Sequence, residues 1–350
     1  MRIWIDILHI PQLNFFKPFI GELSQGGHKV YVSVLGRGKL PAIAKKELQV
    51  FQNVEVVVIG KHRMNKWSAL LEANALRLLQ LPFYVAGKHI DIAFSSGSHV
   101  GIMGKLFRFP SYGFVDDPQT TNYQLLCKFD TQNHSLIYEL PDGQHLDPRD
   151  KMLSVLKEWA YLNPRTFVPK EAALEKYGVK PKEYMFLREV SVGTVNYMGQ
   201  ESGAILGIKD MIPAGMKVLF SLEEKKRRNE YPADWILLQE PIEDIHSLIY
   251  YSAGLVSSGD SMAREAALLG VPAYYLGIRY SMPANAAASK VASLQNRQTM
   301  PFEKWIENLG AESQESRAKS QEELRTHIDH EFIDINQYML NLVEQGICNL

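Results

Sequence analysis

The stretch from Gly254 to Gly277, GLVSSGDSMAREAALLGVPAYYLG, joins a strand pattern to a helix pattern through a small, polar turn. The first turn of a helix holds unpaired backbone N–H groups and the positive end of the helix dipole, so it attracts an anion. The residue types therefore predict a phosphate-binding turn, and the alternative is that Asp260 only caps the helix. The turn consists of Ser257, Ser258, Gly259 and Asp260.

Three residues outside the turn could complete a nucleotide site. Glu265 lies about one turn into the helix, where a carboxylate could accept hydrogen bonds from a ribose. His246 begins the preceding helix and could stack near a base, although a capping role is the ordinary alternative. Arg188 ends a strand, and its planar fork of donors matches a diphosphate. Alternatively, Arg188 forms a salt bridge with Glu189 or with a neighbouring helix.

A second polar set follows the strands of the N-terminal half. The loop DILHIPQLN offers Asp6, His9 and Asn14, and His9 could act as a base or contact a substrate hydroxyl. Alternatively, Asp6 and His9 pair with each other or cap the next helix. Asp116 and Asp117 follow a later strand, where adjacent side chains point to opposite faces. They are therefore poor ligands for a shared metal, and one of them could serve as a base.

Alternating strand and helix patterns position these residues and predict an α/β protein with parallel sheets. The ligands of such sheets collect at the carboxyl ends of the strands, where the polar residues above stand. A proline-broken segment at 158–170 marks a domain boundary, and one last helix is expected over 321–344. The predicted strands cover 3–7, 29–35, 54–59, 90–94, 111–115, 136–140, 184–190, 216–222, 235–241 and 254–256.

Composition narrows the function classes. A chain of 350 residues suggests two domains, and a net charge of −1 gives no reason to expect a nucleic-acid partner. The two cysteines match no metal spacing and fit a reducing compartment. The N-terminus lacks the pattern of a signal peptide, which predicts a cytoplasmic protein. The basic, aromatic stretch 61–67 could touch anionic lipid head groups, or it is a solvated helix start.

Three segments together resemble a family of uncharacterised bacterial and archaeal proteins with a predicted glycosyltransferase type B (GT-B) fold. They are WIDILHIPQLNFFKPFIGEL, LREVS and EDIHSLIYYSAGLVSSGDSMAREAALLGVP. That family is similar to UDP-N-acetylglucosamine 2-epimerase and to nucleotide-sugar glycosyltransferases. The resemblance implies two Rossmann-like domains with a cleft between them, an acceptor domain over 1–160 and a nucleotide-sugar domain over 161–330. A C-terminal helix, 331–350, would cross back to the first domain.

Carried over by position, the resemblance places Gly259 to Ser261 against the diphosphate, Glu265 on the ribose, and Arg188 with Ser191 along the phosphates. It implies no bound metal or other cofactor, because arginine and helix-terminus amides stabilise the charge. The family has glycines ending in Gly-Thr where this chain has Asp260 and Ser261, and a carboxylate there would repel phosphate unless it points away or caps the helix.

The first functional hypothesis is a glycosyltransferase that uses a nucleotide sugar and an unknown acceptor, in cell-surface polysaccharide assembly, with His9 or Asp117 accepting the acceptor's proton. The second is 2-epimerisation of a UDP-sugar, which requires carboxylates such as Asp6, Asp117 and Glu139. The third is a binding protein that retains the fold without the chemistry.

Overall fold

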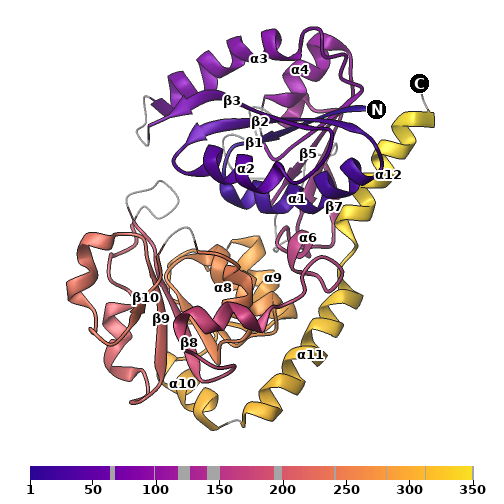
Figure 1. The fold of residues 1–350 in the computed structure, drawn as a ribbon. Helices are drawn as coiled ribbons and strands as arrows, with labels where there is room; N and C mark the ends of the chain where they lie inside the picture. The colour runs from indigo at the N-terminus through magenta and orange to yellow at the C-terminus, as the bar shows by residue number, and fades with distance from the viewer. Residues whose placement is uncertain are drawn as a thin grey trace. The chain divides into compact units, whose positions relative to one another are not determined.

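The structure is a computed structural model that describes residues 1–63, 68–97, 99–116, 127–139, 150–192, 199–239, 242–280, 282–311 and 313–348. The chain divides into two compact units (Figure 1). Unit 1 comprises Met1–Tyr161 and Phe332–Leu350, and unit 2 comprises Leu162–Glu331.

Unit 1 is built on a parallel sheet whose described strands follow the order β3-β2-β1-β4-β5-β6-β7. Apolar β-branched runs such as IWIDI in β1 are buried along their length, as expected for strands covered on both faces. The strands are β1 (Arg2–Ile7), β2 (Lys29–Arg37), β3 (Val54–His62), β4 (Ile92–Ser95), β5 (Ser111–Val115), β6 (Gln132–Leu136) and β7 (Asp150–Leu153).

Helices cover both faces of this sheet (Figure 1). One face carries α1 (Ile10–Gln25) and α2 (Leu40–Leu48), and α12 (Ile335–Cys348) packs beside α1. The other face carries α3 (Arg77–Val85), which continues a π-helical segment (Ser68–Leu76), and α4 (Val100–Phe107). The last helix therefore returns to the first unit, as the resemblance implied.

Unit 2 repeats the architecture with described strands in the order β10-β9-β8-β11-β12-β13, all parallel. Its strands are β8 (Tyr184–Glu189), β9 (Lys217–Leu222), β10 (Ile236–Leu237), β11 (Gly254–Ser257), β12 (Ala273–Tyr275) and β13 (Leu294–Asn296). Its α-helices are α7 (Ile245–Tyr250), α8 (Asp260–Leu268), α9 (Pro283–Val291), α10 (Phe302–Ala311) and α11 (Gln314–Glu331). The short helix α6 (Trp159–Leu162) lies where the chain passes from unit 1 to unit 2.

The predicted strand at 136–140 was wrong, because the real strand is β6, four residues earlier. Its sequence QNHSL is polar, so apolar periodicity could not find it. The polar side chains are nevertheless buried, and His134 stacks on Phe114 with a ring separation of 4.5 Å. The ring nitrogens of His134 also lie 3.1 Å from the carbonyl oxygen of Gly113 and 3.0 Å from the hydroxyl of Tyr338 on α12.

The single helix predicted over 321–344 is in fact two helices, α11 and α12. Asp334 ends the break by capping α12, since its carboxylate accepts a hydrogen bond from the Gln337 N–H at 3.1 Å. Phe332 is buried in the break against Trp159 and Tyr138. Aromatic burial and a cap together favour a turn over a continuous helix at this point.

Candidate functional site

The predicted phosphate turn lies at the carboxyl edge of the sheet of unit 2, between β11 and α8. Gly259 is the N-cap residue of α8, with extended backbone angles (φ −105°, ψ 140°). The turn is held from both sides. The Ser258 hydroxyl accepts a hydrogen bond from the Val190 N–H at 2.9 Å, and its carbonyl accepts one from the Gln200 side chain at 2.9 Å. This bracing makes the start of α8 a rigid platform.

Side chains of the turn itself already satisfy two of its amides. The Gly259 N–H donates to the Ser257 hydroxyl at 3.0 Å, and the Ser261 N–H donates to the Asp260 carboxylate at 3.0 Å. Asp260 therefore places its own negative charge at the positive end of the α8 dipole, where a phosphate would be favoured. It is buried, with an exposed fraction of 3 %.

Two arginines balance the charge of Asp260. Arg264 lies one turn along α8, and Arg279 follows β12. Each places its Nη1 atom 3.3 Å from Asp260 Oδ2. Arg264 is buried and also donates to the Asn285 side chain at 2.7 Å, whereas the Arg279 side chain is 26 % exposed. The carboxylate that the sequence singled out as repulsive to phosphate is thus paired with two guanidinium groups, and one of them belongs to the partly exposed side chain of Arg279.

Glu265 and His246 lie together beside this turn. His246 Nε2 on α7 is 3.6 Å from Glu265 Oε1 on α8, and both side chains are mostly buried. Asp244 caps α7 through its side chain, which accepts from the Ser247 N–H, so His246 is not the capping residue. A carboxylate and an imidazole one helical turn from the platform could bind the hydroxyls and the base of a nucleoside.

Arg188 is held by a partner that the sequence did not predict. Its Nη2 atom lies 2.5 Å from Glu223 Oε1 just after β9, and its Nη1 atom donates to Ser221 at 2.8 Å. Ser191 is drawn to the same acidic pair, because its N–H donates to Glu223 at 2.8 Å and its hydroxyl to Glu224 at 2.9 Å. A diphosphate could reach Arg188 and Ser191 only by displacing these carboxylates.

In unit 1, His9 is the N-cap residue of α1, two residues after β1, although its side chain makes no capping hydrogen bond, and three charged groups lie near it. Burial lowers the pKa of His9 to about 3, with Lys157 and Arg37 acting in the same direction and Asp116 against them. The carboxylate of Asp116 is bound by Lys157, and Nδ1 of His9 is buried without a hydrogen-bond partner among the described residues. His9 is therefore a neutral imidazole with a free ring nitrogen. Asp117 lies outside the described residues.

Asp6 is occupied by a buried ion pair. Both of its oxygens accept hydrogen bonds from Arg77 on α3, at 2.9 and 2.5 Å, and both side chains are fully buried. Asn14 is half-buried on α1, and Glu139 is exposed after β6. A carboxylate held in this way by a guanidinium is a poor acid or base, because the pairing stabilises its charged form.

Several of these partners carried no local sequence signal. Arg264 could have been found, because it stands four residues after Asp260 on one helix and such pairs meet. Arg279, Lys157 and Glu223 reach the sites only through the folding of distant strands to one edge. Within the described ranges, no group of three or more His, Cys, Asp or Glu side chains is placed to hold a metal ion. In the same part of the chain, no helix has the length and apolarity needed to cross a membrane.

Neither a protein-family model nor a curated protein sequence matches the chain. Solved structures do match over the full length. A putative UDP-N-acetylglucosamine 2-epimerase from Listeria monocytogenes has a TM-score of 0.67 at 12 % identity, over 100 % of this chain and 97 % of that one. The glycotransferase of kitacinnamycin has a TM-score of 0.65 at 13 % identity, over 99 % and 98 %.

The chain has the GT-B fold. A third match agrees, the UDP-GlcNAc 2-epimerase from Neisseria meningitidis bound to UDP-GlcNAc, with a TM-score of 0.62 at 11 % identity over 100 % of both chains. The GT-B assignment confirms the expected pair of Rossmann-like units with parallel sheets. Identities this low show the fold alone, so the chemistry must be argued from the residues.

Proposed function

We propose that this GT-B protein binds a nucleoside-diphosphate sugar through unit 2 and transfers the sugar to an acceptor bound by unit 1. The observation that carries the proposal is the platform at the start of α8, where a helix N-terminus, Arg264 and Arg279 surround Asp260. Helix-terminus amides and guanidinium groups are the donors that stabilise the charge of a departing diphosphate. Glu265 and His246 would bind the ribose and the base.

Unit 1 would supply the contacts to the acceptor. The Nδ1 atom of His9, which has no hydrogen-bond partner among the described residues, would accept a hydrogen bond from an acceptor hydroxyl near Asp116 and Lys157; with a pKa of about 3, His9 would orient this hydroxyl and not remove its proton. Because the pKa of His9 is lowered to about 3, the imidazole stays neutral throughout the physiological pH range. We further propose that the protein works in the cytoplasm on a cell-surface polysaccharide.

The ion pair between Asp6 and Arg77 favours sugar transfer over 2-epimerisation. Epimerisation requires carboxylates around the sugar ring to move a proton, and Asp6 was one of three candidates. Its two oxygens are bound by Arg77 instead. The family resemblance and the structural matches keep the epimerase as the alternative, and a UDP-sugar incubated without acceptor separates the two, since only an epimerase converts it.

Calorimetric titration of UDP, dTDP, GDP and CDP against three variants tests the donor site. Glu265→Ala should weaken binding of the preferred nucleotide by about tenfold or more, because it removes a hydrogen-bonding carboxylate. Asp260→Ser should strengthen binding, because the internal anion no longer competes for the α8 terminus. Glu307→Ala, on the exposed face of α10, is the matched control and should bind like the wild type.

Two results would contradict the proposal. The first is the absence of binding by every nucleotide both in the wild type and in Asp260→Ser, which would leave a GT-B fold without a donor site. The second is equal binding by the wild type and Glu265→Ala, which would place the nucleotide elsewhere.

A further inference from the structure

The outer surface of the α3–α4 layer of unit 1 is apolar where it faces solvent. On α3 and the segment before it, Leu76, Leu79 and Phe83 stand at helical spacings of three and four and are 50 %, 65 % and 86 % exposed. The opposite stripe of α3, with Arg77, Leu81 and Val85, is buried. The exposed side chains therefore form a second, unpartnered face and are not the edge of the core.

The neighbouring helix extends this face. α3 and α4 lie side by side on one side of the sheet (Figure 1), and the last turn of α4 exposes Leu106 at 60 % and Phe107 at 37 %. Leu71, in the π-helical segment, is 51 % exposed. We call these six residues the α3–α4 apolar face: Leu71, Leu76, Leu79, Phe83, Leu106 and Phe107. Exposed apolar side chains gathered on two neighbouring helices are a feature of interaction sites.

The charge around this face is positive. Residues 61–110 contain seven Lys and Arg against two Asp and Glu, but Arg77 is buried against Asp6, and Arg63 and Lys88 are paired with Glu72 and Glu55. Exposed Lys61, Lys105 and Arg108 therefore supply most of the positive charge at this surface. Lys61 is exposed in the last residues of β3 and Arg63 just after that strand, and Lys105 and Arg108 are exposed at the end of α4. Between 73 and 110 the single acidic residue is Asp91, which accepts a hydrogen bond from the Arg2 N–H at 2.7 Å.

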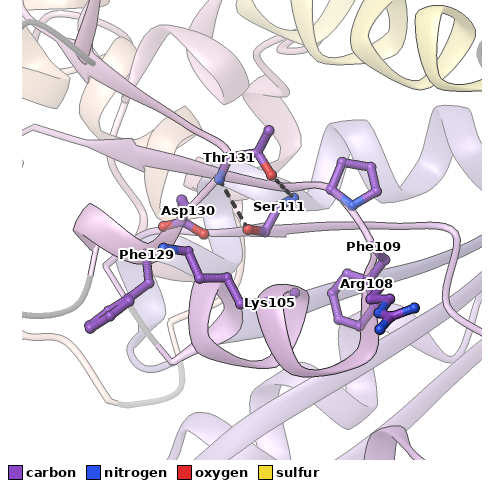
Figure 2. A pocket seen from close by; sticks show the side chains of 9 residues that line it. Lys105, Arg108, Phe109, Ser111, Phe129, Asp130 and Thr131 are labelled. Atoms are coloured by element: carbon purple, nitrogen blue, oxygen red, sulfur yellow. Dashed lines mark hydrogen bonds between the residues drawn. The ribbon is translucent and has the colours of Figure 1, made fainter.

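Lys105 and Arg108 also stand at a cavity of about 350 Å³ between α4 and the start of β5 and β6 (Figure 2). Its lining includes the Ser111 and Thr131 hydroxyls and the ring of Phe129, over which the Lys105 ammonium lies at 5.1 Å. Buried Asp130 lies in the wall, with an exposed fraction of 8 %. Lys105 and Arg108 are therefore exposed residues in the lining of this cavity.

We propose that the α3–α4 apolar face is a membrane-docking surface that inserts among the head groups of an anionic lipid bilayer. Apolar side chains beside a basic rim give binding that depends on both buried apolar area and negative lipid charge. A second copy of this chain is less well matched, because both copies would bring the exposed cations around this face into the contact. The surface differs from the stretch 61–67 that the sequence indicated, of which 64–67 lie outside the described residues.

Vesicle flotation tests this surface with the full-length protein. We expect binding to phosphatidylcholine vesicles that contain about 30 % phosphatidylglycerol, little binding to phosphatidylcholine alone, and release in about 0.5 M NaCl. The double variant Leu79→Ser/Phe83→Ser should lower the partition coefficient by at least about tenfold, since it removes two inserting side chains. Lys105→Glu/Arg108→Glu should abolish the preference for anionic vesicles, and Phe83→Trp should retain binding.

The matched control is Val50→Ser/Val168→Ser, which removes two apolar side chains that are 71 % and 70 % exposed elsewhere. Circular dichroism and melting temperature must show that every variant is folded. The proposal is overturned if the wild type binds neither vesicle or if the control loses as much binding as Leu79→Ser/Phe83→Ser. A dimer that light scattering detects in the wild type and not in Leu79→Ser/Phe83→Ser, with no vesicle binding, would assign the face to a second copy instead.

Discussion

Two buried aspartates, Asp6 and Asp130, differ in how their charge is balanced. Asp6 is buried with a guanidinium that neutralises it, and such a pair is costly to break from one side, by about 3–5 kcal/mol. Asp130 is buried without a cationic partner among the described residues, and neither carboxylate oxygen makes a hydrogen bond of ordinary geometry to them. Burial raises the pKa of Asp130 to about 7, and the nearby Ser111 hydroxyl offsets part of this shift. Asp130 is therefore a source of pH-dependent stability.

We predict that Asp130→Asn stabilises unit 1 at pH 8 and has little effect near pH 4. The folded protein keeps the Asp130 proton up to about pH 7, whereas the unfolded chain releases it near pH 3.8. Folded molecules thus bind more protons in this window, and the free energy of unfolding falls as pH rises through it. The amide removes a penalty of about 4 kcal/mol above pH 7.

Urea unfolding at a series of pH values measures this effect. Asp234→Asn, at an exposed position, is the control and should leave the pH dependence unchanged. A difference between Asp130→Asn and wild type that is the same at pH 4 and pH 8 would show that the carboxyl titrates normally.

At the scale of elements, unit 2 depends on how the end of α8 meets α11. Gly270 follows α8 with a φ of +72°, and a Cβ at this position would lie 2.5 Å from the Gln321 carbonyl oxygen. The Gln321 side chain donates to the Leu269 carbonyl at 2.8 Å and accepts from the Lys182 ammonium at 2.6 Å. Because Gly270 lets the backbones at the end of α8 and in α11 come close together, the side chain of Gln321 on α11 can hydrogen-bond both to the end of α8 and to Lys182 just before β8.

Gly270→Ala should therefore destabilise the protein by more than backbone strain alone. A left-handed alanine costs about 1–2 kcal/mol, and the contact with Gln321 adds a clash with backbone atoms that cannot rotate away. Gly178→Ala is the matched comparison, because Gly178 has a φ of +58° but no atom within 4 Å of its Cβ position. Equal melting temperatures for the two variants would refute the role of close approach.

At the scale of the whole molecule, the C-terminal helix α12 belongs to the unit that begins the chain. Ile335, Met339 and Val343 are nearly fully buried, and the Tyr338 hydroxyl meets His134 of β6. Asn336 donates to the Ala160 carbonyl at 2.7 Å. The helix thus completes the core of unit 1 from the far end of the sequence.

Met339→Ala/Val343→Ala should destabilise unit 1 selectively. Two large-to-small changes in a packed interface cost about 4–6 kcal/mol together, a large part of the stability of an ordinary domain. Hydrogen–deuterium exchange should then accelerate in β1 to β5 and remain unchanged in β8 to β12. The exposed neighbour Gln337→Ala is the control. Uniform acceleration in both sheets would mean that the two units unfold as one.

Much of this organisation was readable in the sequence. Runs such as YMFLRE and KVLFSL are strands because continuous apolar segments between breakers can be buried only in a parallel sheet covered on both faces. The same sequence patterns placed His9 and the turn at Gly259 after the carboxyl ends of strands, because the succession of strand, loop and helix along the chain shows where each strand ends. The polar strand β6 could not be predicted from these patterns, because its burial depends on contacts with Phe114 and α12.

The sequence by itself determined the two parallel α/β units and the positions of the polar turns, because these depend on periodicity, caps and breakers within a few residues. Only the tertiary structure decided which charges meet. Asp6 is bound by Arg77, Arg188 by Glu223, and Asp260 by Arg264 and Arg279. Apart from Arg264, these partners lie far away in sequence, and no local pattern specifies them. Their pairing follows from the folding of distant segments to one place. Where the carboxylate is buried, as at Asp6 and Asp260, an unpaired charge would also be too costly to keep.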